Sequence, residues 1–234
     1  LAGNTHDAKS IIKLAEGASV VLAVGHIERH NEIVRYAKKR IDNGDWGDII
    51  SLSATRFSNY PDRINDVGVL FDLTIHDVDI ICYFASSMVK SLYAAGGKTR
   101  NKHHEDHVNL SLRFDNGLIG NCDTSWLTPM KVRKLNISTT THHITLDYLN
   151  QDIDIISFDY KEGEDSCITT PDYDLVGKKI SLEKHEPLSN ELVNFLSSIS
   201  LKSVPLVSGE DGLRSVKIVE ASLVSLNTNS LINF

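Results

Sequence analysis

The chain has 234 residues, of which 41% are hydrophobic and 24% charged, as is typical of globular proteins. Its net charge of −7 argues against nucleic acids and anionic membranes as partners, and no apolar run is long enough to span a bilayer. The cysteines Cys82, Cys122 and Cys167 are odd in number and far apart, which indicates free thiols in a reducing compartment, expected to be the cytoplasm.

The N-terminal segment has the pattern of the last part of an α/β unit. A helix is predicted over residues 1–17, with Asn4 or Thr5 as its cap and Gly17 as a left-handed stop. Residues 19–24 are continuously apolar, which predicts a strand buried on both faces, as in a parallel sheet. The other strands of such a unit are not found in the sequence.

His26 and Arg29 follow the carboxyl end of this predicted strand, where ligands of parallel sheets usually bind. The next elements are a helix over residues 31–41 and a strand over 48–57. A loop rich in turn-forming residues then carries Tyr60 and Arg63 toward a long apolar helix.

This long helix, predicted over residues 68–84, is the most informative part of the chain. It is apolar nearly all round, which indicates burial, except for one narrow arc that holds Asp72, His76, Asp79 and Tyr83. A carboxylate one turn before a histidine can orient the imidazole and stabilise its charged form. Two interpretations are equally open here: an acid–base pair, or a buried histidine that Asp72 satisfies.

The second half of the chain is rich in strands. The pattern predicts strands over 89–96, 108–114, 118–126, 131–139, 143–148, 153–158 and 180–184, with a hairpin turn at 115–117 and an exposed loop at 161–170. Two helices follow, one over 189–199 with Ser189 as its cap and one from Ser208 or Gly209 to about residue 227. The predicted class is α+β: an α/β remnant, then a large, mostly antiparallel open sheet with helices on one face. The uncovered face predicts a homo-oligomer, a dimer or tetramer.

Other motifs were weighed for chemistry. No glycine-rich phosphate loop of the form G-x-G-x-x-G occurs in the sequence. The run 103–107 has metal-ligating residue types, but neighbouring residues point in different directions, so a solvated loop is preferred and no metal is predicted. Trp126 is either core or the aromatic wall of a pocket. The candidates for an anion pocket are Arg56, Arg63, Lys131 and Arg133, with Arg63 preferred because its loop leads into the long helix.

Three segments, 5–16, 24–31 and 72–80, resemble the Gfo/Idh/MocA oxidoreductases in residues and in order. The resemblance implies a Rossmann remnant over 1–30 followed by a substrate-binding and oligomerisation domain over 31–234. It implies an NAD- or NADP-dependent sugar dehydrogenase in which His76 is the acid/base and Asp72 supports it. It also implies cofactor contacts by His26 and Arg29. The loop 60–68 and the segment 123–129 resemble members acting on UDP-N-acetylglucosamine, with Tyr60, Arg63 and Trp126 shaping the sugar site.

The sequence also departs from this family. It begins where the first Rossmann half of the family ends, so the glycine-rich turn and the catalytic lysine of a Glu-Lys-Pro motif are not in it. Residues 29–32 differ from the usual Arg-Phe-Asn-Pro, which weakens the transfer of cofactor contacts to His26 and Arg29. We therefore expect the 234-residue chain alone to be inactive. The alternatives are a catalytically inactive binding or oligomerisation module and, least favoured, a metal-dependent hydrolase.

Overall fold

The computed structural model describes residues 1–64, 66–158 and 176–234. Its main feature is an open sheet with the strand order β8-β7-β6-β5-β1-β4-β3-β2-β9. The strands are β1 (Ile49–Phe57), β2 (Val89–Gly97), β3 (His107–Phe114), β4 (Ile119–Ser125), β5 (Val132–Thr139), β6 (His142–Asp147), β7 (Asp152–Ser157), β8 (Val176–Ser181) and β9 (Ile232–Asn233). Only β1 and β4 pair in parallel, and the other neighbours in this described sheet are antiparallel.

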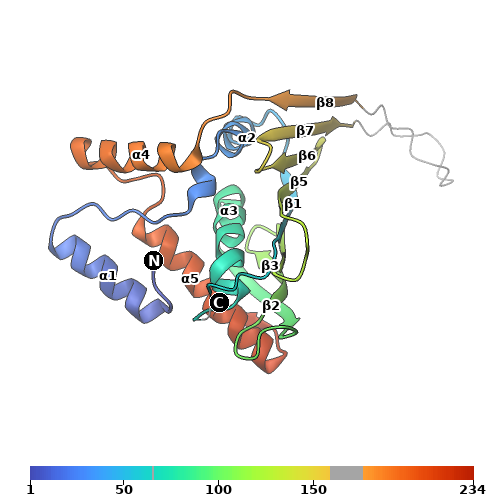
Figure 1. The fold of residues 1–234 in the computed structure, drawn as a ribbon. Helices are drawn as coiled ribbons and strands as arrows, with labels where there is room; N and C mark the ends of the chain where they lie inside the picture. The colour runs from blue at the N-terminus through green and yellow to red at the C-terminus, as the bar shows by residue number, and fades with distance from the viewer. Residues whose placement is uncertain (65, 159–175) are drawn as a thin grey trace.

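Helices gather on one side of this sheet (Figure 1). They are α1 (Thr5–Gly17), α2 (Glu32–Asp42), α3 (Ile75–Ala85), α4 (Pro187–Leu201) and α5 (Gly209–Thr228), with a 3₁₀ turn η1 (Ile27–His30) and a π-helical turn η2 (Leu70–Thr74). The predicted α+β class, with a large, mostly antiparallel open sheet, is thus confirmed. In the described part of the chain, no helix is both long enough and apolar enough to cross a membrane.

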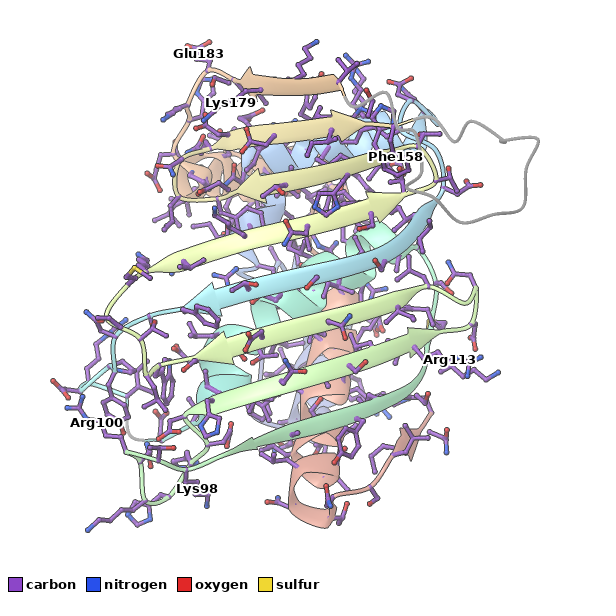
Figure 2. The ribbon with its side chains drawn as sticks, turned by 90° about the vertical axis from the view of Figure 1, so that its right-hand side faces the viewer. Lys98, Arg100, Arg113, Phe158, Lys179 and Glu183 are labelled. Carbon is purple, nitrogen blue, oxygen red and sulfur yellow. The ribbon has the colours of Figure 1, made fainter. Side chains whose placement is uncertain are left out.

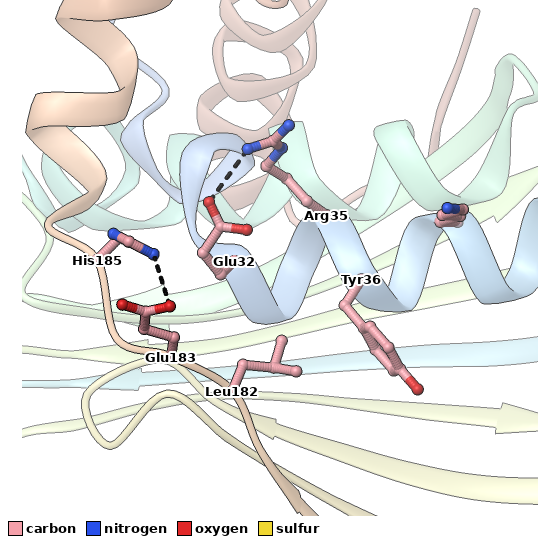
Figure 3. Close-up of a pocket in the computed structure, with 7 residues that line it drawn as sticks. Glu32, Arg35, Tyr36, Leu182, Glu183 and His185 are labelled. Atoms are coloured by element: carbon pink, nitrogen blue, oxygen red, sulfur yellow. Dashed lines mark hydrogen bonds and ion pairs between the residues drawn. The ribbon is translucent and has the colours of Figure 1, made fainter.

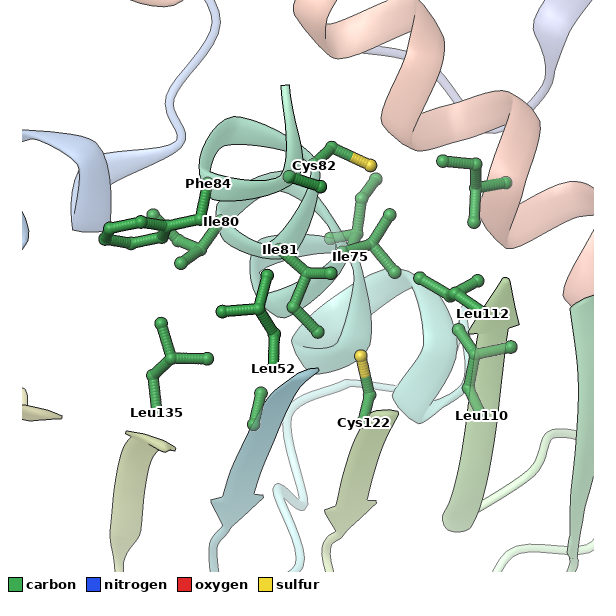
Figure 4. Packing of buried hydrophobic residues seen from close by; sticks show 14 of the residues in the cluster. Leu52, Ile75, Ile80, Ile81, Cys82, Phe84, Leu110, Leu112, Cys122 and Leu135 are labelled. Atoms are coloured by element: carbon green, nitrogen blue, oxygen red, sulfur yellow. The ribbon is translucent and has the colours of Figure 1, made fainter. Parts of the chain in front are cut away.

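The core lies between α3 and the middle strands. Ile80, Ile81 and Phe84 of α3 lie over Leu52 of β1 and Leu135 of β5 (Figure 4). Each such side chain contributes about 1.5–3 kcal/mol when it is fully buried. This packing fixes the depth and rotation of the helix on the sheet, and with them the position of the polar residues along it. The thiols of Cys82 and Cys122 are free and buried in the same layer, whereas Cys167 and the predicted loop 161–170 lie outside the described residues.

Several helix boundaries follow from local capping. The Asn4 side chain accepts from the backbone N–H of Asp7 and caps α1, as predicted, and Ser208 forms a capping box with Asp211 at α5. Two predicted ends are wrong. The left-handed residue after α1 is Ser19 rather than Gly17, and α4 starts after Glu186 rather than Ser189. Pro187 at the first helical position sets the latter start, because its fixed φ suits the first turn.

The predicted strand over residues 19–24 is wrong. Only Ala23 makes a β-bridge, to Ser208, and Val20 is 60% exposed. A strand exists only through a neighbour that supplies ladder hydrogen bonds, and within the described residues this segment finds one bridge. The predicted strand over 180–184 is displaced, since β8 spans Val176–Ser181. The short β9, which pairs with β2, was not predicted.

No helix of the described residues covers the other face of the sheet (Figure 2). Its side chains alternate with the core residues along each strand. They are mostly small and polar, and include Ser51, Ser53, Thr55, Asn109, Ser111, Asn121, Asn136, Ser138 and Thr145. Thr145 Oγ1 and Asn136 Oδ1 form a hydrogen bond across two strands on this face, at 2.8 Å. The predicted association of subunits through this surface stays a prediction.

Candidate active site

The candidate site is a pocket of about 460 Å³ at the end of β1. It is lined by the loop after β1, the π-helical turn η2, the first turn of α3 and the start of β5. His76 and Asp72 lie in it, as do all four cationic residues predicted from the sequence, namely Arg56, Arg63, Lys131 and Arg133. The topology explains this gathering, because β1 is flanked by β4 and β5 at the centre of the sheet.

The long helix does not begin as a regular α-helix. The N–H of Ile75 donates to the carbonyl of Leu70, five residues back, so the first turn is a π turn. The carboxylate of Glu105 accepts from the N–H of Leu70, at 3.1 Å, and holds the start of this turn. The wider turn changes the angle between Asp72 and the residues of α3. The predicted single polar arc is therefore split between two environments.

Asp72 faces Trp126. The indole Nε1 donates to Asp72 Oδ2 at 3.2 Å, and burial raises the pKa of this carboxyl while Trp126 and the nearby arginines oppose the rise. The structure gives Asp72 this partner, and His76 Nδ1 is buried without one. The supporting role of Asp72 toward His76 stays a prediction, whereas its contact with Trp126 is a finding.

His76 carries the chemistry that this pocket can offer. Burial and the positive charge of Arg56 lower the pKa of His76 to about 3, so the imidazole is neutral at pH 7. Nδ1 is enclosed, which leaves Nε2 as the ring nitrogen available to the pocket. A neutral imidazole at a pocket wall can accept a proton from a bound hydroxyl group.

The four cationic side chains of the pocket differ in burial and in their ion pairs. The Arg56 guanidinium is buried and donates to Asp77 at 2.9 and 3.0 Å, and it also meets Glu28 at 3.3 Å. Arg133 lies 3.5 Å from the same Glu28 and is 31% exposed. Arg63 and Lys131 are exposed. The inner cations Arg56 and Arg133 are thus matched by the carboxylates of Asp77 and Glu28. The exposed cations Arg63 and Lys131 are the ones best placed to meet an anion.

Glu28 and Asp77 were missed by the sequence reasoning. Asp77 follows His76 directly and is fully buried beneath the pocket, where it fixes Arg56. A buried carboxylate in an otherwise apolar helix was the available signal, because such a group needs a cation. Asp77 lies outside the predicted polar arc, on the side of the helix that meets Arg56.

His26 and Arg29 lie beside this pocket, behind His76. Both are buried, and the Arg29 guanidinium donates to Asp79, Asp211 and the carbonyl of Leu206. Arg29 therefore acts as a clamp between η1, α3 and α5. Since the sequence has no glycine-rich phosphate loop, these residues do not by themselves fit a dinucleotide. Their predicted role as cofactor contacts stays a prediction.

Tyr60 and Trp126 do not line the pocket. Trp126 is 1% exposed, and its ring meets that of Tyr60 edge to face with centroids 5.9 Å apart. Arg100 in turn lies over the Tyr60 ring at 4.5 Å. The structure thus shows core packing for Trp126 together with its hydrogen bond to Asp72. Of the three predicted sugar contacts, only Arg63 lines the pocket directly.

Two other candidate regions offer less chemistry. Within the described residues, no three His, Cys, Asp or Glu side chains are placed to hold a metal ion. In the histidine-rich loop, Asp106 instead accepts from the backbone N–H groups of Thr99, Arg100 and Asn101. A second pocket, of about 430 Å³, lies between α2 and the segment after β8 (Figure 3). Two pairs of its side chains interact within the pocket, Arg35 with Glu32 and His185 with Glu183.

The fold is that of the C-terminal domains of the Gfo/Idh/MocA oxidoreductases. Residues 34–145 match the family model described as GFO/IDH/MocA C-terminal domain.

Similar proteins include UDP-N-acetylglucosamine 3-dehydrogenase of Acidithiobacillus ferrooxidans, 24% identical over 211 residues, which cover 90% of this chain and 64% of that protein. Myo-inositol 2-dehydrogenase of Thermotoga maritima is 22% identical over 234 residues, 95% of this chain and 67% of that one. The chain thus spans about two thirds of the length of these relatives.

Solved structures show the same likeness of fold. The structure of the A. ferrooxidans enzyme has a TM-score of 0.82 at 23% identity and covers 96% of this chain and 68% of that one. A levoglucosan dehydrogenase in complex with NADH and levoglucosan has a TM-score of 0.83 at 16% identity, covering 99% of this chain and 71% of that one. The proteins similar to this chain are therefore sugar, inositol and nucleotide-sugar dehydrogenases.

Proposed function

We propose that this chain supplies the substrate domain and the acid/base residue of an NAD- or NADP-dependent sugar dehydrogenase. The observation that carries the proposal is geometric: the His76 imidazole lines a pocket together with four cationic side chains, those of Arg56, Arg63, Lys131 and Arg133. His76 accepts the proton of the sugar hydroxyl as the carbon beneath it is oxidised. A nicotinamide cofactor bound to the complete protein would supply the hydride acceptor.

The preferred substrate is a nucleotide-sugar such as UDP-N-acetylglucosamine. Arg63 and Lys131 at the mouth and Arg133 on the wall offer positive charge to a diphosphate, while His76 lies deeper. The similar A. ferrooxidans protein, named for activity on this substrate, supports the same choice. Residues 1–30 are proposed to complete a dinucleotide-binding domain, and 31–234 to form the substrate domain.

Two further features belong to the same proposal. The uncovered sheet face, polar and without a helix, supports a homo-oligomer in which two sheets meet. The free buried thiols Cys82 and Cys122 support a cytoplasmic location, because disulfides are rare there.

The test uses the complete protein that carries this chain, assayed by the absorbance of reduced nicotinamide. His76→Ala should lower turnover by about 10²–10⁴-fold, the usual contribution of a general base. The control His103→Ala changes an exposed histidine and should leave turnover unchanged. Full turnover by His76→Ala would overturn the role of this residue.

A second variant tests the substrate class. Arg63→Ala should raise KM for UDP-N-acetylglucosamine and leave KM for free N-acetylglucosamine unchanged, because only the former carries the diphosphate. An equal change in both KM values would remove the nucleotide from the proposal and leave a neutral sugar.

A further inference from the structure

His26 is a buried group that the proposed chemistry does not use. Its side chain is 5% exposed, and neither ring nitrogen has a hydrogen-bond partner among the described residues. A buried polar group without a partner costs about 1–3 kcal/mol, so its presence calls for a physical reason. Nδ1 of His76 is in the same condition.

The position of His26 supplies that reason. Its ring meets the ring of His76 edge to face, with centroids 5.5 Å apart and planes at 89°. His26 Nε2 also lies 4.0 Å from Asp79 Oδ1. Asp79 is itself fixed by Arg29, which donates to both carboxylate oxygens at 2.6 and 2.7 Å. His26 is therefore near both a fixed carboxylate and the candidate acid/base residue.

We propose that His26 is a positioning residue that holds His76 in the Nδ1–H tautomer. In this proposal the carboxylate of Asp79, nearest to Nε2 of His26, favours N–H at that nitrogen, and the face of the His26 ring meets the edge of the perpendicular His76 ring. An aromatic face is negative and a ring N–H edge is positive, so the buried Nδ1 of His76 is favoured as N–H. The lone pair then resides on Nε2, which is the nitrogen open to the pocket.

The charges around both rings are consistent with neutral imidazoles. Burial lowers the pKa of His26 and of His76 to about 3, so at pH 7 each ring has one N–H and one lone pair, and the tautomer decides where the lone pair lies. The charged side chains whose electrostatic influence reaches the rings are Arg29, Asp79, Asp211 and Arg214 for His26, and Arg56 and Arg133 for His76.

This inference rests on the proposed function in one respect, namely that the lone pair of His76 accepts the proton of the substrate hydroxyl. The sequence predicted that Asp72 orients the His76 imidazole. In this inference Asp79 does so instead, acting through His26. Because of the π turn, Asp72 faces Trp126 instead.

The experiment is long-range ¹⁵N–¹H correlation spectroscopy of the 234-residue chain labelled at its histidine nitrogens, which reports the tautomer of each neutral imidazole. His76 is expected as the Nδ1–H form. In His26→Leu, which removes the ring, this preference should be lost. In His26→Phe, which keeps a ring face, it should be retained. His103→Leu, at an exposed loop, is the matched control and should leave the His76 signals unchanged.

Finding His76 as the Nε2–H tautomer in the unaltered chain would overturn the inference, and this needs no variant to fold. An unchanged His76 tautomer in a folded His26→Leu chain would do the same. The outcome is independent of turnover. If the tautomer behaves as expected while His76→Ala retains activity, the proposed function fails and the role of His26 stands. If His76→Ala loses activity while the tautomer does not behave as expected, the role of His26 fails and the proposed function stands.

Discussion

The pair formed by Arg56 and Asp77 makes a sharp test of how the pocket is built. Both side chains are at most 3% exposed, and three nitrogen–oxygen contacts of 2.9–3.0 Å join them. Arg56→Met keeps a flexible apolar stem but leaves the Asp77 carboxylate buried without its main partner. Removing one member of a buried ion pair costs about 3–5 kcal/mol, which for a chain of this size lowers the melting temperature by roughly 6–20 °C.

The matched control is Arg35→Met. Arg35 pairs with Glu32 at 3.1 Å, but it is 55% exposed, and such a surface pair is worth at most about 1 kcal/mol. Both variants are compared with the unaltered chain by thermal and chemical unfolding. Equal losses of stability in the two variants would refute the argument that burial makes the Arg56 pair costly to break.

The same variant has a defined pH dependence. Burial raises the pKa of Asp77, and Arg56 opposes that rise. Without Arg56, the folded-state pKa of Asp77 rises further above its unfolded value. A carboxyl of this kind contributes stability at low pH and loses it as pH rises through the folded-state pKa. The penalty of Arg56→Met should therefore be smaller at pH 5 than at pH 8, and a penalty independent of pH would contradict this reasoning.

Two further predictions concern the start of the long helix and the buried histidines. A Cβ on Gly68 would overlap the Glu105 carboxylate, so Gly68→Ala should cost about 1–3 kcal/mol in urea unfolding, whereas Gly3→Ala, with open space around it, should not. An equal effect of the two substitutions would show that Glu105 gives way freely. The folded-state pKa values of His26 and His76, about 3, lie below the ordinary 6.5, so their contribution to stability is present above pH 6.5 and is lost as pH falls toward 3. Each histidine should add about 1.4 kcal/mol per pH unit to the decline of the free energy of unfolding. A chain with both histidines changed to Leu should therefore show a shallower decline. An unchanged slope would show that carboxyl groups alone cause the decline.

Local signals allowed much of the fold to be predicted. The caps Asn4 and Ser208 act through neighbouring backbone N–H groups, so the sequence carries the full information for those helix starts. Most strands end within a residue or two of the predicted ranges, because alternation marks the buried face. By contrast, residues 19–24 have the composition of a strand but form a single β-bridge among the described residues, because a full ladder needs a neighbouring strand that composition cannot supply.

The sequence predicted several residues that line the pocket but not the contacts between the side chains around it. The four cations and His76 do share one pocket, as the chain order of loop and helix indicated. The contacts of Asp72 and Asp79 could not be predicted, since a wheel at 100° per residue assumes an unbroken α-helix. The π turn depends on Glu105, which approaches Leu70 from a distant loop, and it separates the two carboxylates.

The place of β1 in the sheet has a consequence for how the chain folds. β1 lies between β4 and β5, and the last residue of β5 follows the end of β1 by about 80 residues. At a synthesis rate of about 5–20 residues per second, roughly 4 to 16 seconds pass on the ribosome before both edges of β1 have their permanent neighbours. Contacts this distant in sequence give a high contact order, which slows folding and leaves strand edges open to other chains. We expect refolding yields to fall steeply with protein concentration for this reason, and the Ser and Thr residues along β1 to limit that loss by keeping its outer face polar.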